Sequence, residues 1–81
     1  MRLRLRYFAS IREFTGISEE QLEVPEGSTA ETLKQRVQVL HNALKGQEGN
    51  ILVAVNGSFV EPKRVLKQGD EVALFPPVSG G

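Results

Sequence analysis

The chain has 81 residues, of which 40% are hydrophobic and 25% charged, and this composition is expected of one small globular domain. Ten basic and ten acidic residues give a formal net charge of zero, which argues against nucleic acid and membrane surfaces as partners. There is no cysteine, so disulfides, iron–sulfur clusters, thiolate zinc sites and a cysteine nucleophile are excluded.

The first segment of the chain predicts a β-strand. Its opening residues contain no apolar run of the kind found in a signal peptide, so a cytoplasmic protein is expected. Residues 2–9 alternate with the period of a half-buried strand. One face carries Leu3, Leu5 and Tyr7, and the other carries Arg2, Arg4, Arg6 and Phe8. We interpret the arginine row as a solvated sheet face, with a binding stripe as the alternative.

A short helix and a returning strand are predicted next. Ser10-Ile11-Arg12-Glu13 has the form of a capping box with Ser10 as the N-cap, and Gly16 is expected to end the helix after little more than one turn. Residues 21–24 alternate again before a Pro-Glu-Gly turn. We therefore expect a second strand that lies beside the first as a wide hairpin.

The longest helix is predicted to begin near residue 28. Ser28-Thr29-Ala30-Glu31 is a second capping-box pattern, and Gly46 is a plausible end. The apolar residues between them recur at helical spacing, at Leu33, Val37, Leu40 and Leu44. His41, the single histidine, lies off this stripe near the helix end, and we interpret it as a solvated cap rather than a metal ligand or a catalytic group.

The last third of the chain predicts three more strands. Residues 51–55 are a continuous apolar run, which indicates a strand that is buried on both sides or central in a sheet. Asn56-Gly57 predicts a tight turn into a short strand over residues 58–60. Residues 71–75 alternate, with Val72 and Leu74 on one face and Ala73 and Phe75 on the other.

These elements predict an α+β domain. The stripe of the long helix needs a sheet face to pack against, and a single sheet is available. We therefore expect a ubiquitin-like β-grasp fold over residues 1–81, in which one main helix packs across a mixed four- to five-stranded sheet and residues 76–81 form an extended, flexible C-terminal tail. Phe8 and Phe75 are expected on the uncovered face, whereas the strand of Phe59 is too short to fix its side.

The tail, Phe75-Pro76-Pro77-Val78-Ser79-Gly80-Gly81, combines a stiff base with a thin tip. Proline has a fixed φ and no N–H, so Pro76 and Pro77 cannot continue a sheet ladder. Glycine has no side chain, so Gly80 and Gly81 can enter a passage that is too narrow for other residues. We interpret the tail as a means of delivering the carboxylate of Gly81 into a partner's cleft. A loose and inert terminus is the alternative.

No active site can be assembled from the side chains, so the chain is not expected to catalyse a reaction alone. There is one histidine, and no Gly-rich phosphate loop follows a strand. The carboxylate of Gly81 could become an acyl donor if ATP converted it to an acyl adenylate. A sulfur nucleophile would then give a thiocarboxylate, and an amine would give an amide. We expect no metal or cofactor on this chain and expect a partner protein to bind the ATP.

Four motifs along the full length carry a resemblance to a known family. They are Tyr7-Phe8-Ala9 with Ile11-Arg12-Glu13 and Gly16, Val53-Ala54-Val55-Asn56, Gly69-Asp70-Glu71-Val72, and the tail from Phe75 to Gly81. Together with the expected β-grasp fold they resemble the small, sulfur-carrying subunit of molybdopterin synthase. The Pro-Pro pair before the small-residue tip is the most specific of these features.

The resemblance implies a function and a set of partners. A ubiquitin-activating-like enzyme would adenylate Gly81, and a sulfurtransferase would convert it to a thiocarboxylate. The tail would enter a pocket of the large synthase subunit, within a heterotetramer, and pass sulfur to cyclic pyranopterin monophosphate in molybdenum cofactor biosynthesis. The implied reactive end is Gly80 and Gly81, and the implied partner interface is Phe8, Phe59, Phe75, Pro76, Pro77, Val78 and Ser79.

Three alternatives remain open from the sequence. A sulfur carrier of thiamine biosynthesis would share the fold and the Gly-Gly end, but we expect it to be shorter and to lack the Pro-Pro-Val-Ser approach. A ubiquitin-like modifier would instead be joined through Gly81 to lysines of other proteins. A plain β-grasp interaction module would have an inert tail.

Overall fold

The computed structural model describes residues 1–77 of the chain. The strands and α-helices in chain order are β1 (Arg2–Tyr7), α1 (Ala9–Thr15), β2 (Glu19–Glu23), α2 (Ala30–Leu40), β3 (Leu52–Val55), β4 (Ser58–Phe59) and β5 (Glu71–Phe75). Two short 3₁₀ turns, η1 (Asn42–Leu44) and η2 (Glu48–Asn50), connect α2 to β3.

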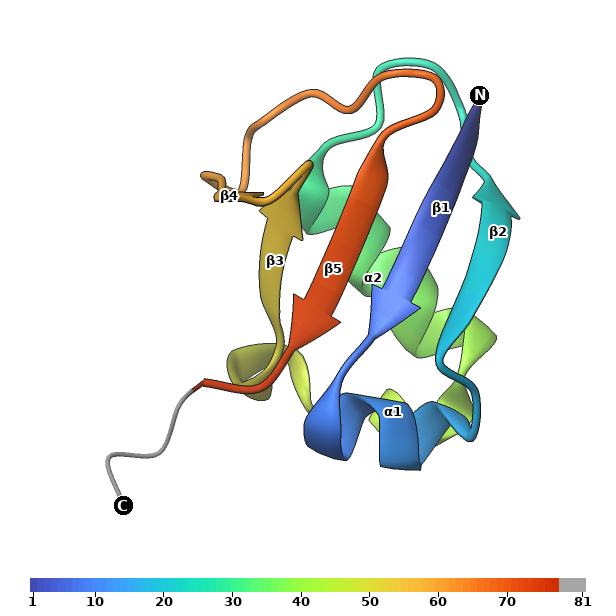
Figure 1. Cartoon of the computed structure of the whole chain (residues 1–81), viewed down its shortest axis with the longest axis vertical. Helices are drawn as coiled ribbons and strands as arrows, with labels where there is room; N and C mark the ends of the chain where they lie inside the picture. The colour runs from blue at the N-terminus through green and yellow to red at the C-terminus, as the bar shows by residue number, and fades with distance from the viewer. Residues whose placement is uncertain (78–81) are drawn as a thin grey trace.

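The strands form one mixed sheet in the order β2-β1-β5-β3-β4. β1 and β5 are parallel neighbours at its centre, with Leu5 opposite Val72, and the other pairs are antiparallel. Helix α2 crosses behind the sheet in Figure 1, and no helix within residues 1–77 lies over the opposite sheet face. The predicted ubiquitin-like β-grasp fold is confirmed, with five strands.

The core lies between α2 and the covered face of the sheet. Alternation in β1 buries Leu3, Leu5 and Tyr7, and alternation in β5 buries Val72 and Leu74, as predicted. Helix α2 and the segments around it complete the core with Ala30, Leu33, Val37, Ile11, Val24, Leu44, Ile51, Val53, Val55 and Leu66. The other side chains of the two central strands therefore face away from the helix.

Helix α2 begins one residue later than its capping pattern predicted. Thr29, not Ser28, is the N-cap: its hydroxyl accepts a hydrogen bond from the Thr32 N–H, and the Thr32 hydroxyl accepts one from the Thr29 N–H. The loop before β5 fixes this choice, because the next two N–H groups of the helix donate to backbone oxygens of Arg64 and Pro62. Those donors have no partner within the helix itself.

The same helix ends earlier than the apolar stripe predicted. It stops at Leu40, with His41 as its C-cap, and not near Gly46. Leu44 is still fully buried, because the η1 turn carries it back into the core. Leu40 belongs to the predicted stripe, but its side chain is largely exposed.

One further local prediction was wrong, and another held in one of its two alternatives. Helix α1 begins at Ala9 after an extended Phe8, so Ser10 is inside the helix and is not its N-cap; Gly16 ends the helix as predicted, in the left-handed conformation. Strand β3 is not buried on both sides, although it lies inside the sheet between β5 and β4. Its burial alternates, with Val53 and Val55 inside and Leu52 outside.

Candidate apolar interface on the uncovered sheet face

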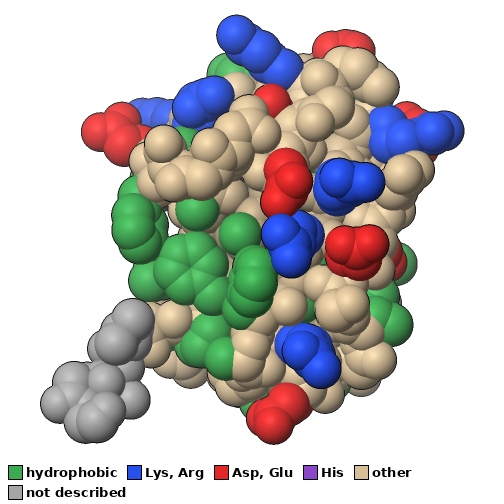
Figure 2. Space-filling model, in the orientation of Figure 1, with side chains coloured by type: hydrophobic (Ala, Val, Ile, Leu, Met, Phe, Trp, Pro, Cys, Tyr) green, Lys and Arg blue, Asp and Glu red, His purple; other side chains and the backbone are tan. Residues whose placement is uncertain are grey.

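The uncovered sheet face carries a cluster of apolar side chains on one side. We call it the apolar patch: it consists of Phe8, Leu52, Phe59 and Phe75, with the small Ala54 and Ala73 between them. Phe59 is 75% exposed, and its ring meets that of Phe75 edge to face, with the centroids 5.6 Å apart. Figure 2 shows hydrophobic side chains gathered over β3, β4 and β5, whereas charged side chains of both signs are spread over the rest of this face.

Strand pairing accounts for this gathering. Ala54 lies opposite Ala73 of β5 and opposite Phe59 of β4, and Leu52 lies opposite Phe75. Opposite residues of paired strands point to the same face, so these side chains share one surface. The structure thereby places Phe59 on the same side as Phe75, which its short strand had left open.

Phe8 extends the patch across the centre of the sheet. It follows β1, and its N–H donates to the Leu74 oxygen at 3.1 Å, which continues the parallel ladder to the level of Phe75. The side chain is 40% exposed, and the Arg6 guanidinium lies 5.3 Å from its ring centroid. Phe8 therefore stands where the apolar patch meets the charged part of the face.

Sequence reasoning missed Leu52 as a member of the patch. Its side chain is 36% exposed beside Phe75, although it lies in the apolar run that predicted a strand buried on both sides or central in a sheet. The signal for its exposure is weak, because both faces of β3 carry apolar residues and the alternation is hidden.

The chain leaves the sheet beside this patch. Strand β5 ends at Phe75, Pro76 is half-buried and Pro77 is exposed. Figure 1 shows β5 ending at the same edge of the molecule as α1. The predicted site residues Val78, Ser79, Gly80 and Gly81 lie outside the described residues.

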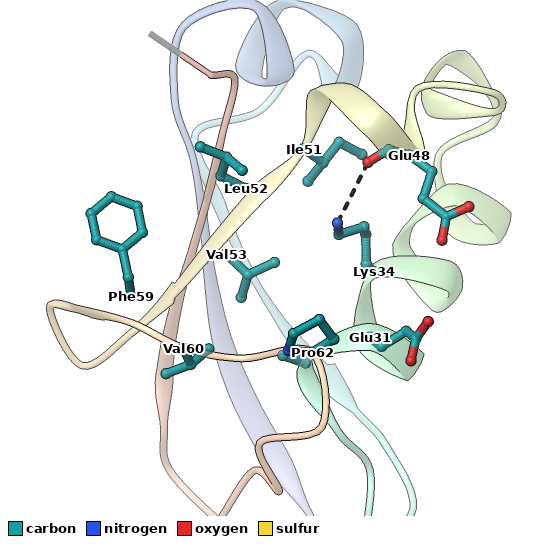
Figure 3. A pocket seen from close by; sticks show the side chains of 10 residues that line it. Glu31, Lys34, Glu48, Ile51, Leu52, Val53, Phe59, Val60 and Pro62 are labelled. Carbon is teal, nitrogen blue, oxygen red and sulfur yellow. Dashed lines mark hydrogen bonds between the residues drawn. The ribbon is translucent and has the colours of Figure 1, made fainter.

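A groove of about 280 Å³ continues the apolar surface around the edge of the sheet (Figure 3). It lies between the start of α2 and the β3–β4 hairpin, and Leu52 and Phe59 line it as well as the patch. Lys34 spans the groove and donates from Nζ to the Glu48 backbone oxygen at 3.4 Å. The apolar surface open to a partner thus reaches from Phe8 to the sheet edge.

A polar cluster lies on the opposite side of the domain, where β2 meets the end of α2. The Tyr7 hydroxyl donates to Glu20 Oε2 at 2.5 Å, and His41 Nε2 contacts the same oxygen. The ring centroids of Tyr7 and His41 are 5.6 Å apart. Burial, and then the hydrogen bond and charge of Glu20, raise the pKa of Tyr7 above its usual range. His41 is the C-cap residue of α2, as its position predicted, but its side chain is a half-buried partner of Glu20 and is not solvated.

Comparison with known proteins places these features in a family. Residues 5–81 match the ThiS family. A molybdopterin synthase sulfur carrier subunit from Chlamydomonas reinhardtii is 39% identical, with 100% of both chains covered. Within residues 1–77, no helix is long and apolar enough to span a membrane.

Two solved structures have closely similar folds. A Pyrococcus furiosus protein assigned as molybdopterin converting factor, subunit 1, is 32% identical with a TM-score of 0.88, covering 96% of this chain and 99% of that one. Small archaeal modifier protein 1 of Haloferax volcanii is 28% identical with a TM-score of 0.84, covering 95% of this chain and 98% of that one. With a match over residues 5–81 and a full-length relative at 39% identity, this chain belongs to the ThiS/MoaD family, in which the curated relatives are molybdopterin synthase sulfur carrier subunits.

Proposed function

We propose that this chain is the sulfur carrier subunit of a molybdopterin synthase and acts in molybdenum cofactor biosynthesis in the cytoplasm. The observation that carries the proposal is the 39% identity to such a subunit over the whole of both chains. The apolar patch supports it, because a carrier that delivers a tail into another protein needs a docking surface near the base of that tail.

The proposed chemistry takes place at Gly81. A carboxylate oxygen attacks the α-phosphorus of ATP on the adenylating enzyme, which forms the acyl adenylate and releases pyrophosphate. Sulfide-level sulfur delivered by a sulfurtransferase then attacks the acyl carbon, and the bond to AMP breaks as a thiocarboxylate forms. The thiocarboxylate sulfur attacks a carbon of cyclic pyranopterin monophosphate and displaces an oxygen substituent from that carbon. Water then cleaves the acyl–sulfur bond, which restores the carboxylate and leaves the sulfur on the product. The adenylating enzyme binds the ATP, and this chain binds no cofactor of its own.

The apolar patch is the proposed contact with the large synthase subunit, in a heterotetramer with the large subunits at the centre. Phe8, Phe59 and Phe75 supply the aromatic area, which contributes strongly to binding when a partner covers it. Pro76 and Pro77 carry the chain away from the sheet, since neither has an N–H to pair with a further strand. Val78, Ser79 and Gly80 would lead Gly81 into the large subunit's active site.

Intact-mass spectrometry tests the proposed chemistry. After incubation with ATP, a sulfur donor and the adenylating enzyme, the chain should gain the mass that replaces one oxygen by one sulfur. A variant with one residue added after Gly81 is the control, because it folds identically but displaces the reactive carboxylate. An unchanged mass of the wild-type chain would reject the sulfur carrier.

A second candidate function is that of a protein modifier. It is favoured by the similarity to the Haloferax volcanii small archaeal modifier protein 1. In this case an amine, and not sulfur, would displace AMP from the same acyl adenylate, which forms an amide with a lysine of another protein. Because the last basic residue is Lys67, trypsin would leave residues 68–81 attached to a modified lysine. Such remnants would indicate the modifier, and thiocarboxylate formation without them would indicate the carrier.

A further inference from the structure

Among the described residues, one arginine on the charged part of the uncovered sheet face has no side-chain partner. In the antiparallel β1–β2 pair, Arg2 lies opposite Glu23 and Arg6 lies opposite Glu19, whereas Arg4 lies opposite the neutral Gln21. Arg2 forms an ion pair with Glu23 at 3.1 Å, and Arg6 forms one with Glu71 at 3.3 Å. Among residues 1–77, the exposed guanidinium of Arg4 forms no ion pair and no side-chain hydrogen bond.

Arg4 stands at a polar hollow of about 220 Å³. Its lining is Arg2, Leu3, Arg4, Gln21, Gln68, Gly69 and Glu71. The Gln68 side-chain oxygen accepts a hydrogen bond from the backbone N–H of Arg2 at 2.7 Å, which leaves the amide hydrogens of Gln68 for another acceptor. Glu71 is the one carboxylate in the lining, and Arg6 already binds it. The hollow therefore has hydrogen-bond donors in excess and one unbalanced positive charge.

This hollow lies on the same face as the apolar patch. Arg4 is level with Glu71, and Phe8 is level with Phe75, so the two regions are four residues apart along the strands, about 13 Å. Arg6 connects them, since it binds Glu71 at the edge of the hollow and lies over the Phe8 ring. A protein that covers the patch and extends along β1 would also cover the hollow.

We propose that Arg4 binds an aspartate or glutamate side chain of the large synthase subunit, which sets the rotation of that subunit on the sheet. This inference rests on the function proposed above. Guanidinium groups bind carboxylates through two parallel N–H bonds, and such a pair has a fixed direction. Apolar contacts alone do not select one rotation of the large subunit on the sheet. A charge pair at Arg4, about 13 Å from the patch, fixes the orientation in which the tail meets the active site.

Binding of purified variants to the large subunit tests the proposal. We expect Arg4→Gln to weaken binding about tenfold and to lessen its dependence on salt. Arg4→Lys keeps the charge but lacks the planar fork, so an intermediate affinity is expected. Arg36→Gln is the matched control, because it removes the same charge from an exposed position on α2, behind the sheet. Since Arg4 has no ion pair and no side-chain hydrogen bond within residues 1–77, the thermal stability of Arg4→Gln should equal that of the wild-type chain.

A charge exchange identifies the partner residue. Arg4→Glu should bind more weakly than Arg4→Gln, and replacing one acidic residue of the large subunit by arginine should restore its binding. Equal affinities of Arg4→Gln and Arg36→Gln for the large subunit would overturn the inference and leave the carrier function intact. The same conclusion would follow if Arg4→Gln bound the adenylating enzyme more weakly but bound the large subunit normally. A wild-type chain that does not bind the large subunit would overturn the proposed function itself.

Discussion

Phe59 and Phe75 meet edge to face, with their ring centroids 5.6 Å apart, although their strands are not neighbours. Strand β3 lies between β4 and β5, and its Ala54 lies opposite Phe59 on one side and opposite Ala73, two residues before Phe75, on the other. The small side chain of Ala54 lets the rings touch across the intervening strand. The result is a continuous aromatic surface that is supported by one face of the sheet and not by the core.

The first prediction concerns this aromatic pair. Phe59→Ala should weaken binding to the large subunit by roughly thirtyfold, about 2 kcal/mol, because exposed aromatic residues contribute most strongly once a partner buries them. The free energy of unfolding should fall by only about 1 kcal/mol, the contribution of an aromatic pair. Calorimetric titration and urea denaturation measure the two quantities. Val39→Ala, at an 83% exposed position on α2, should change neither.

The same comparison applies to Phe75→Ala. If this variant lost much of its thermal stability and kept its affinity for the large subunit, Phe75 would be a core residue and the proposed interface would be wrong.

A second prediction concerns Tyr7 and alkaline pH. Because the pKa of Tyr7 is raised in the folded chain, the folded state holds a proton that the unfolded state loses above a pH of about 10. The free energy of unfolding should therefore fall as pH rises above that value, with Tyr7 contributing up to about 1.4 kcal/mol per pH unit. Tyr7→Phe should lack this contribution and be less stable by about 1 kcal/mol at neutral pH.

Urea denaturation of both chains across the alkaline range measures this effect. The chain has one tyrosine and no tryptophan, so tyrosinate absorbance reports the ionisation of Tyr7 directly. Parallel pH profiles for the two chains would show that Tyr7 ionises equally in the folded and unfolded states.

A third prediction concerns Asp70, which is 7% exposed and connects two turns. Its carboxylate accepts the Lys67 N–H at 2.8 Å and the Asn56 side-chain amide at 3.0 Å. Asp70→Ala leaves both donors without this acceptor, so it should cost about 3 kcal/mol in urea denaturation. Asp70→Asn should be intermediate, since an amide accepts through one oxygen only. Glu26→Ala, in an exposed loop, is the control and should be neutral.

A fourth prediction concerns the hairpin that carries Phe59. Asn56 and Gly57 have φ values of 51° and 85°, as the tight turn requires. Gly57→Ala should destabilise the fold by about 1 kcal/mol, because a side chain at this φ is strained. Gly49→Ala is the matched control: its φ is not left-handed, and an added Cβ has open space there too. Equal melting temperatures for the two variants would contradict this account of the turn.

The sequence predicted best where a polar residue marks the outer face of a strand. In β1, arginines flank Leu3 and Leu5, and this alternation correctly assigned Leu5 to the core. In β5, Glu71 is the one polar residue, and counting from it correctly assigned Val72 to the core and Phe75 to the outer face. In β3, both faces are apolar, so alternation could not reveal that Leu52 is exposed. The same lack of contrast made β3 look buried on both sides.

Long-range contacts account for the other errors. Ser28 and Thr29 are both good N-caps, and the choice between them depends on the Arg64 and Pro62 oxygens, which no local pattern contains. His41 was judged by its neighbours in the chain, whereas its partner Glu20 comes from β2. The sequence indicates a turn and a family motif at Asp70, but no local pattern reveals its hydrogen bond with Asn56, which lies 14 positions away.

The parallel pairing of β1 with β5 has a consequence for biosynthesis. The centre of the sheet joins residues as distant as Arg6 and Glu71, which are 65 positions apart, so it cannot form until β5 has left the ribosome. Contacts of such long range slow folding, since nearly the whole chain must be ordered before they are made. Residues 76–81 are synthesised directly after β5. A nascent chain therefore acquires its finished sheet and its tail almost together, and one truncated before β5 has neither.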